Sequence, residues 1–117
     1  MKSLTILLTT VRDELNKIEE EEERKIFYHY RRPSDVKSNY GVWHELGEKD
    51  SHSSDNKKQE QQIQGYLDYY TLVEYDPVID MIQEALNNLN CGGWTLNSVQ
   101  YEDETNLIHY EWYFTVV

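Results

Sequence analysis

The sequence is poor in the residues that build disulfide scaffolds, membrane spans and nucleic-acid surfaces. Its 117 residues include one cysteine, Cys91, so no intrachain disulfide can form and a disulfide-stapled secreted scaffold is excluded. No apolar run approaches the ~20 residues that a membrane-spanning helix needs. Basic residues are also few, 11 against 22 acidic ones. The resulting net charge of −11 argues against a nucleic-acid partner, because Lys and Arg supply the affinity for phosphates.

Motifs for phosphate binding and nucleophilic catalysis are missing as well. Gly92 and Gly93 form the only glycine pair, and they precede an expected strand instead of opening a helix, as a phosphate loop would. No serine stands between glycines in a nucleophile elbow. Cys91 follows an expected helix, whose dipole at that end disfavours a reactive thiolate. We therefore expect no enzyme and no cofactor.

The histidines give only weak grounds for a metal site. They are His29, His44, His52 and His109. His109 shares a strand face with Glu111, which makes a two-ligand contact feasible, but no third ligand stands at a recognisable spacing. Surface or cross-strand histidines are the simpler interpretation, and we expect no metal.

Two amphipathic helices are indicated by apolar residues at spacings of three and four. The first spans residues 3–19 with Ser3 as N-cap, and the second begins at Asp76 and Pro77, an N-cap followed by proline at the first helical position. The expected buried stripes are Leu4, Leu7, Leu8, Val11, Leu15 and Ile18 in the first helix, and Val78, Ile79, Ile82, Ala85, Leu86 and Leu89 in the second.

Five strands complete the expected order α-β-β-β-α-β-β. Three are expected at residues 25–30, 40–45 and 63–73, and two form a closing hairpin around a turn at 101–108. Short connections favour an α+β fold, with a mainly antiparallel sheet of about five strands and both helices packed on one face. We expect a single domain over 1–117, with a mobile polar loop at about 47–62.

The strands are apolar on both faces, which is unusual for a small domain. In the expected hairpin register, Tyr101 faces Ile108, Val99 faces Tyr110 and Asn97 faces Trp112. On this register one sheet face would be the core face, carrying Leu67, Val99, Tyr101, Ile108, Tyr110, Trp112 and Phe114. The opposite face would carry Tyr66, Tyr70, Leu96, Tyr113 and Val117. We predict that these residues form an interface with a second subunit or another protein, the alternative being a sheet that wraps toward a half-barrel.

Several segments together resemble small tail proteins of long-tailed bacteriophages and prophages, namely tail terminator and head–tail joining (minor tail) proteins. The segments are YGVWHE at 40–45, the polar loop, QGYLDYYT at 64–71, the Asp76-Pro77 helix, and WTLN at 94–97 leading to HYEW at 109–112. They cover most of the chain from Tyr40 onward, but none of them is a catalytic motif.

The resemblance implies a structural protein that self-associates into a ring, usually a hexamer, which caps the tail tube and docks tail or neck proteins. Subunits of that family join through their sheets, and an acidic lumen, consistent with a charge of −11, would let DNA pass without sticking. The implied location is the bacterial cytoplasm during assembly and then the virion tail, with no membrane partner. The alternative from charge alone is a monomeric acidic binding module, an inhibitor or immunity-type protein with a basic partner.

Overall fold

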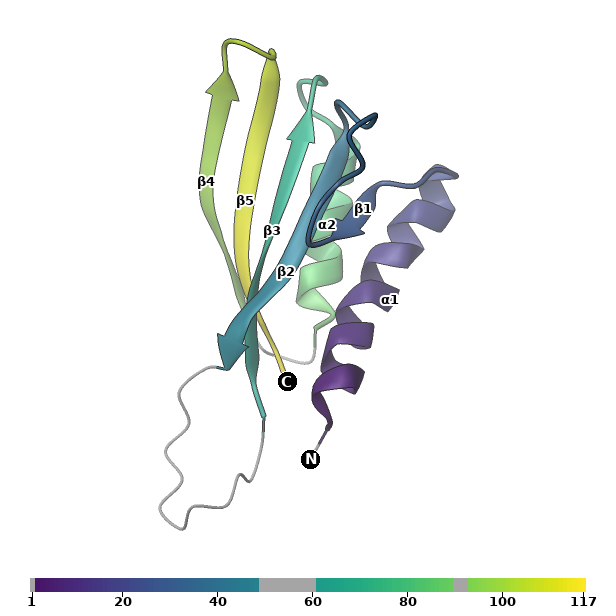
Figure 1. The fold of residues 1–117 in the computed structure, drawn as a ribbon, viewed down its shortest axis with the longest axis vertical. Helices are drawn as coiled ribbons and strands as arrows, with labels where there is room; N and C mark the ends of the chain where they lie inside the picture. The colour runs from purple at the N-terminus through teal and green to yellow at the C-terminus, as the bar shows by residue number, and fades with distance from the viewer. Residues whose placement is uncertain (1, 49–60, 90–92) are drawn as a thin grey trace.

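The computed structural model describes residues 2–48, 61–89 and 93–117. Its elements are α1 (Leu4–Glu22), β1 (Phe27–His29), β2 (Tyr40–Glu48), β3 (Ile63–Thr71), α2 (Pro77–Asn87), β4 (Trp94–Glu102) and β5 (Leu107–Val116) (Figure 1). The fold is α+β, and the predicted element order is confirmed. The first strand is shorter than expected, and the second is longer.

Both helices begin where their capping residues predict. The Ile6 backbone N–H donates to Ser3 Oγ over 3.2 Å, and the Val78 N–H donates to Asp76 Oδ1 over 2.9 Å. Each capping oxygen thus accepts from an N–H group that has no partner within its helix. The helix α1 ends at Glu22, and the C-cap residue Glu23 has a left-handed backbone with φ 56°. Glu19 in its last turn accepts hydrogen bonds from the N–H groups of residues 26 and 27, both over 2.8 Å, and so ties the helix end to β1.

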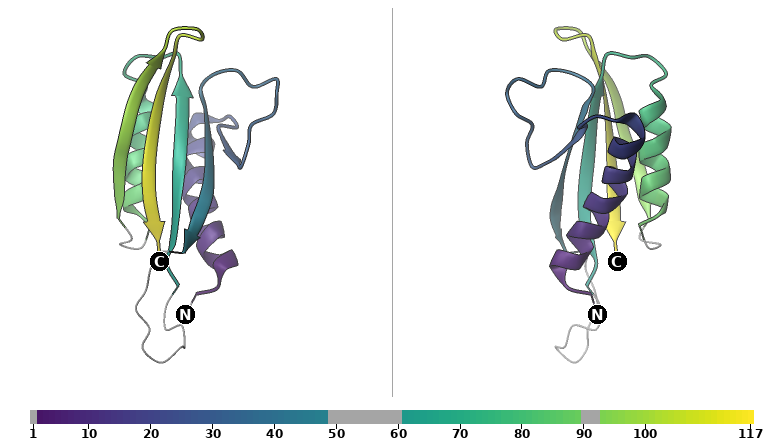
Figure 2. Two further views of the ribbon diagram at one scale, coloured as in Figure 1. Left: turned by 60° about the vertical axis from the view of Figure 1, so that its left-hand side comes forward. Right: turned by 90° about the vertical axis from the view of Figure 1, so that its right-hand side faces the viewer.

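The sheet has the strand order β1-β2-β3-β5-β4, and every pairing except one is antiparallel. The exception is β1, which pairs with β2 in parallel, so residues 30–39 form a crossover connection and not a hairpin turn. Since β5 lies between β3 and β4, residues from β3 and β5 that are far apart in sequence become direct neighbours. Figure 2 shows α1 and α2 on one face of the sheet, the helix face, and no helix of the described residues on the opposite, open face.

The core lies between the helices and the helix face of the central strands. Its largest fully buried side chains are Trp112 and Tyr69, consistent with the high aromatic content. Both predicted helical stripes are in this core, except that Leu4 is 44% exposed. No helix in the described part of the chain is long and apolar enough to cross a membrane.

The hairpin register is confirmed in its outer half and wrong in its inner half. Tyr101 pairs with Ile108 and Val99 with Tyr110, as predicted. A β-bulge between Leu96 and Ser98 then adds one residue to β4, so Leu96 and not Asn97 lies opposite Trp112. The bulge reverses the face of every β4 residue before it.

Two consequences follow for the predicted faces. Leu96 and Trp94 lie on the helix face with Trp112, so the prediction that Leu96 belongs to the opposite face is wrong. Farther along β4, Val99 and Tyr101 are 51% and 60% exposed, although they were expected in the core.

Other predictions concern residues that the structure does not describe. The predicted loop at 47–62 begins within β2, which extends to Glu48, and its central part, residues 49–60, lies outside the described residues. Cys91 lies outside them as well.

Candidate functional site: the open face of the sheet

The open face is built from three rows of side chains that cross β2, β3 and β5. The registers align Tyr40, Tyr70 and His109 in the first row, Val42, Asp68 and Glu111 in the second, and His44, Tyr66 and Tyr113 in the third. The outer rows are aromatic, and the middle row is acidic. This pattern follows from strict alternation along three strands whose inward residues form the core.

The first row is a continuous stack of rings. The ring centroids of Tyr40 and Tyr70 are 4.9 Å apart, and those of Tyr70 and His109 are 4.2 Å apart. The guanidinium of Arg32, from the connection between β1 and β2, lies 5.2 Å from the Tyr40 ring centroid and covers this end of the face. Tyr40 is therefore only 7% exposed although no helix lies over it.

The third row is more open. The His44 and Tyr66 rings meet edge to face at 4.1 Å, and Tyr66 and Tyr113 are tilted at 6.2 Å. Tyr113 is 45% exposed at the end of this row. Side chains of this size, presented together on an uncovered sheet face, offer contact area to another molecule.

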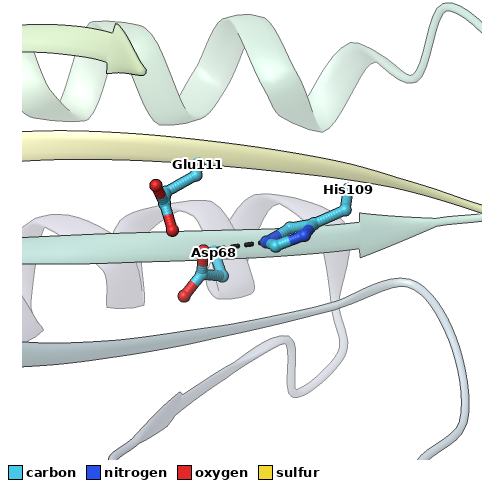
Figure 3. Close-up of side chains that lie close together, drawn as sticks. All are labelled: Asp68, His109 and Glu111. Carbon is cyan, nitrogen blue, oxygen red and sulfur yellow. Dashed lines mark hydrogen bonds and ion pairs between the residues drawn. The ribbon is translucent and has the colours of Figure 1, made fainter. Parts of the chain in front are cut away.

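The two carboxylates of the middle row and His109 of the first row form the one cluster of metal-ligand type found among the described residues. Asp68 on β3 pairs directly with Glu111 on β5, and His109 is the next residue on the same face of β5. Figure 3 shows the three side chains close together, with His109 Nε2 lying 2.8 Å from Asp68 Oδ1. One ligand atom from each residue lies within 4.8 Å of the others. Asp68 is the third residue of ligand type, which sequence spacing did not reveal.

The cluster is shielded from solvent and electrostatically coupled. The side chains of His109 and Asp68 are 18% and 13% exposed. The hydrogen bond to Asp68 raises the pKa of His109, against the opposing effect of burial. Burial, with a further contribution from the charges of Asp68 and Glu111, raises the pKa of both Tyr66 and Tyr70. The face therefore combines aromatic outer rows with two carboxylates at its centre.

The five residues predicted for an interface are only partly brought together. Tyr66, Tyr70 and Tyr113 share the open face, whereas Leu96 lies on the helix face because of the bulge. Val117 follows the last residue of β5, and its backbone oxygen accepts a hydrogen bond from Lys2 Nζ over 3.3 Å. The interface role of these residues stays a prediction.

A hollow lies on the other side of the sheet, between α1 and the strands β1 and β2. It has a volume of about 300 Å³, and Arg12, Lys25, His29 and Trp43 are among its lining residues. The His29 ring stacks on Trp43 at 3.9 Å, and its Nε2 lies 2.8 Å from Glu45 Oε2. His29 is thus on the helix face, so it does not converge with the histidines of the open face.

Comparison with known proteins adds no relative to these observations. No model of a known protein family matches the chain, and no curated protein matches it.

Proposed function

We propose that this protein is a structural assembly subunit of a phage or prophage tail, of the tail terminator type, which associates with copies of itself and docks tail or neck proteins. The sequence resemblance described above suggests this class. The observation that carries the proposal is the open face, where Tyr66, Tyr70 and Tyr113 lie together and no described helix covers them. Tyrosine combines a large apolar ring with a polar tip and is enriched at protein interfaces.

A second apolar surface offers a different patch for the same kind of contact. On the helix face of β4, Leu96, Val99 and Tyr101 are 40%, 51% and 60% exposed. A contact that joins one patch of a subunit to a different patch of its neighbour is heterologous, and it generates a ring when the rotation closes. Two distinct apolar patches on opposite faces meet this requirement.

The charge of the chain is consistent with a ring through which DNA passes. With 22 acidic and 11 basic residues, the protein repels a phosphate backbone instead of binding it. The open face itself adds to this negative field through Asp68 and Glu111. The proposal therefore places protein partners on the aromatic surfaces and no nucleic acid on any of them.

The first experiment is absolute molar mass by light scattering on a sizing column, over a hundredfold range of concentration. The proposal expects a species with a mass several times 14.0 kDa, near six times that value for a hexamer. Tyr113→Asp should weaken this association about 30-fold to 1000-fold, because loss of an interface aromatic that contributes strongly to binding costs about 2–4 kcal/mol. Tyr75→Asp is the matched control, since Tyr75 is 88% exposed in the connection between β3 and α2.

Two outcomes would overturn the proposal. A mass of 14.0 kDa at every concentration would contradict self-association of the isolated chain. An oligomer that Tyr113→Asp and Tyr75→Asp leave equally intact would show that subunits meet elsewhere than on the open face. Circular dichroism of both variants separates loss of association from loss of the fold.

A second candidate function is a monomeric acidic binding module, and the acidic residues at one end of the molecule favour it. The last turn of α1, with Glu19–Glu22, and the β4–β5 hairpin tip, with Glu102, Asp103 and Glu104, both point to this end (Figure 1). The helix dipole adds negative potential there, because α1 ends in the same direction. This function predicts a monomer that binds a basic protein with an affinity that falls steeply with salt.

A further inference from the structure

The acidic row of the open face has an unbalanced charge. Asp68 and Glu111 face each other directly across β3 and β5, an arrangement in which like charges destabilise a sheet. Among the described residues no lysine or arginine forms an ion pair with either carboxylate, and the partner of Asp68 is His109. Even with His109 protonated, the cluster keeps a net negative charge in a half-buried setting. A bound cation would remove this repulsion.

The geometry of the three side chains suits a transition metal. Nε2 of His109 lies 2.8 Å from Asp68 Oδ1, and the ligand atoms of all three residues lie within 4.8 Å of one another. Ligands on a tetrahedral Zn²⁺ lie about 2.0–2.1 Å from the ion and hence about 3.3 Å from each other. The His109–Asp68 contact would open by about 0.5 Å and Glu111 would close in through side-chain rotation, with no movement of the strands.

Neighbouring side chains contact Glu111 and His109 in the way that residues around a metal site orient the ligands. Asn97 Nδ2 donates to Glu111 Oε1 over 2.6 Å, which orients that carboxylate. The second nitrogen of His109, Nδ1, faces Glu102 with 4.0 Å between Nδ1 and Oε1, and Tyr70 stacks against the ring. Metal-binding imidazoles characteristically have a carboxylate at the nitrogen that does not bind the metal.

We propose that Asp68, His109 and Glu111 form a binding site for a divalent transition metal such as Zn²⁺, with the fourth ligand position open on the uncovered face of the sheet. One imidazole and two carboxylates favour zinc or a similar first-row metal over Ca²⁺ and Mg²⁺, which prefer oxygen ligands alone. A water molecule or a side chain of a docked protein can take the open position. The site does not depend on the proposed ring, because all three ligands come from one chain.

The test titrates metal-free protein with Zn²⁺ in competition with a chromophoric chelator, and with Co²⁺ while its visible d–d absorption is recorded. One equivalent of metal should bind, with an imidazole-dependent Co²⁺ spectrum, and excess Mg²⁺ should not displace it. His109→Gln and Asp68→Asn should each lower Zn²⁺ affinity more than about 10-fold, the loss that removal of even an outer contact causes. Asn97→Ala should lower it by about 10-fold through loss of ligand positioning.

His44→Gln is the matched control, because His44 lies on the same face but packs on Tyr66 instead of a carboxylate. It should leave the affinity unchanged. The proposal is overturned if no stoichiometric binding is detected, or if His109→Gln binds Zn²⁺ as tightly as the parent protein. Where His109→Gln fails to fold, Glu111→Gln, which removes charge with little change in shape, decides in its place. Molar mass measured with and without Zn²⁺ keeps this result separate from that on self-association.

Discussion

Asp76 is the residue whose replacement should show most clearly how this fold is held together. Its carboxylate is 7% exposed and serves two elements at once. Oδ1 accepts from the Val78 N–H at the start of α2, while Oδ2 accepts from the hydroxyl groups of Tyr69 over 2.8 Å and Thr71 over 2.7 Å at the end of β3. Tyr69 and Thr71 are both fully buried, so neither hydroxyl can turn to solvent.

The cost of Asp76→Ala can be estimated from these contacts. Loss of a helix N-cap costs about 1 kcal/mol. A buried hydroxyl left without an acceptor costs about 1–3 kcal/mol, which applies to Tyr69. Thr71 adds little, because its hydroxyl also lies 3.0 Å from Asn39 Oδ1 and can donate there. The expected loss is about 2–4 kcal/mol of the free energy of unfolding, a large share of the ~5–15 kcal/mol of a typical domain.

Urea denaturation of four proteins tests this reasoning: the parent, Asp76→Ala, Tyr69→Phe and the double variant. In the Tyr69→Phe background no orphaned hydroxyl remains, so Asp76→Ala should cost only about 1 kcal/mol, the value of the cap. The reasoning is refuted if Asp76→Ala costs the same in both backgrounds, or if it costs less than about 1 kcal/mol in the parent.

Two further predictions concern the strand β2 and its neighbours. Gly65→Ala should destabilise the fold by about 1–3 kcal/mol in thermal or urea unfolding. The reason is that its new methyl group would lie 2.8 Å from the backbone oxygen of His44. An unchanged stability would contradict the tight packing of β3 on β2. The pKa of Glu45 is lowered because the hydrogen bonds from Tyr30 and His29 outweigh the opposing effect of burial. Because the pKa of Glu45 is lowered by folding, its ionised carboxylate stabilises the fold at any pH above its pKa in the unfolded state. This stabilisation is lost as the pH falls through its pKa in the folded state. Unfolding free energies measured from pH 7 to pH 3 should therefore fall less steeply in Glu45→Gln, and parallel curves would contradict the prediction.

Local signals predicted the parts of this fold that depend on neighbours in sequence. Ser3 and Asp76 cap their helices as their side-chain chemistry indicates, and the outer hairpin pairs formed as predicted because the turn sets their register. The bulge before Ser98 was not predicted, since alternation was preserved on both sides of it and nothing in the composition marks the extra residue. Its effect was to move Leu96 from one face of the sheet to the other.

Features that depend on the order of strands in the sheet could not be predicted from the spacing of residues in the sequence. The parallel pairing of β1 could not be read from a three-residue strand. The cluster on the open face was missed because Asp68 and His109 are 41 positions apart and meet only because β5 inserts next to β3. The pair His109 and Glu111 was visible from alternation alone, whereas its third member required knowledge of which strands are neighbours.

The two edges of the sheet differ in a way that bears on uncontrolled aggregation. At one edge β4 is nine residues long and contains neither lysine nor proline, the residues that commonly blunt exposed edges. At the other edge β1 has three residues, and Glu19 of α1 accepts a hydrogen bond from its first backbone N–H, that of Phe27. An endless fibre built by strand addition needs two receptive edges on every molecule, whereas a single receptive edge allows two molecules to pair and then stop. By covering residues 41–43 of β2, the short parallel strand shortens the second edge at which such a fibre could grow.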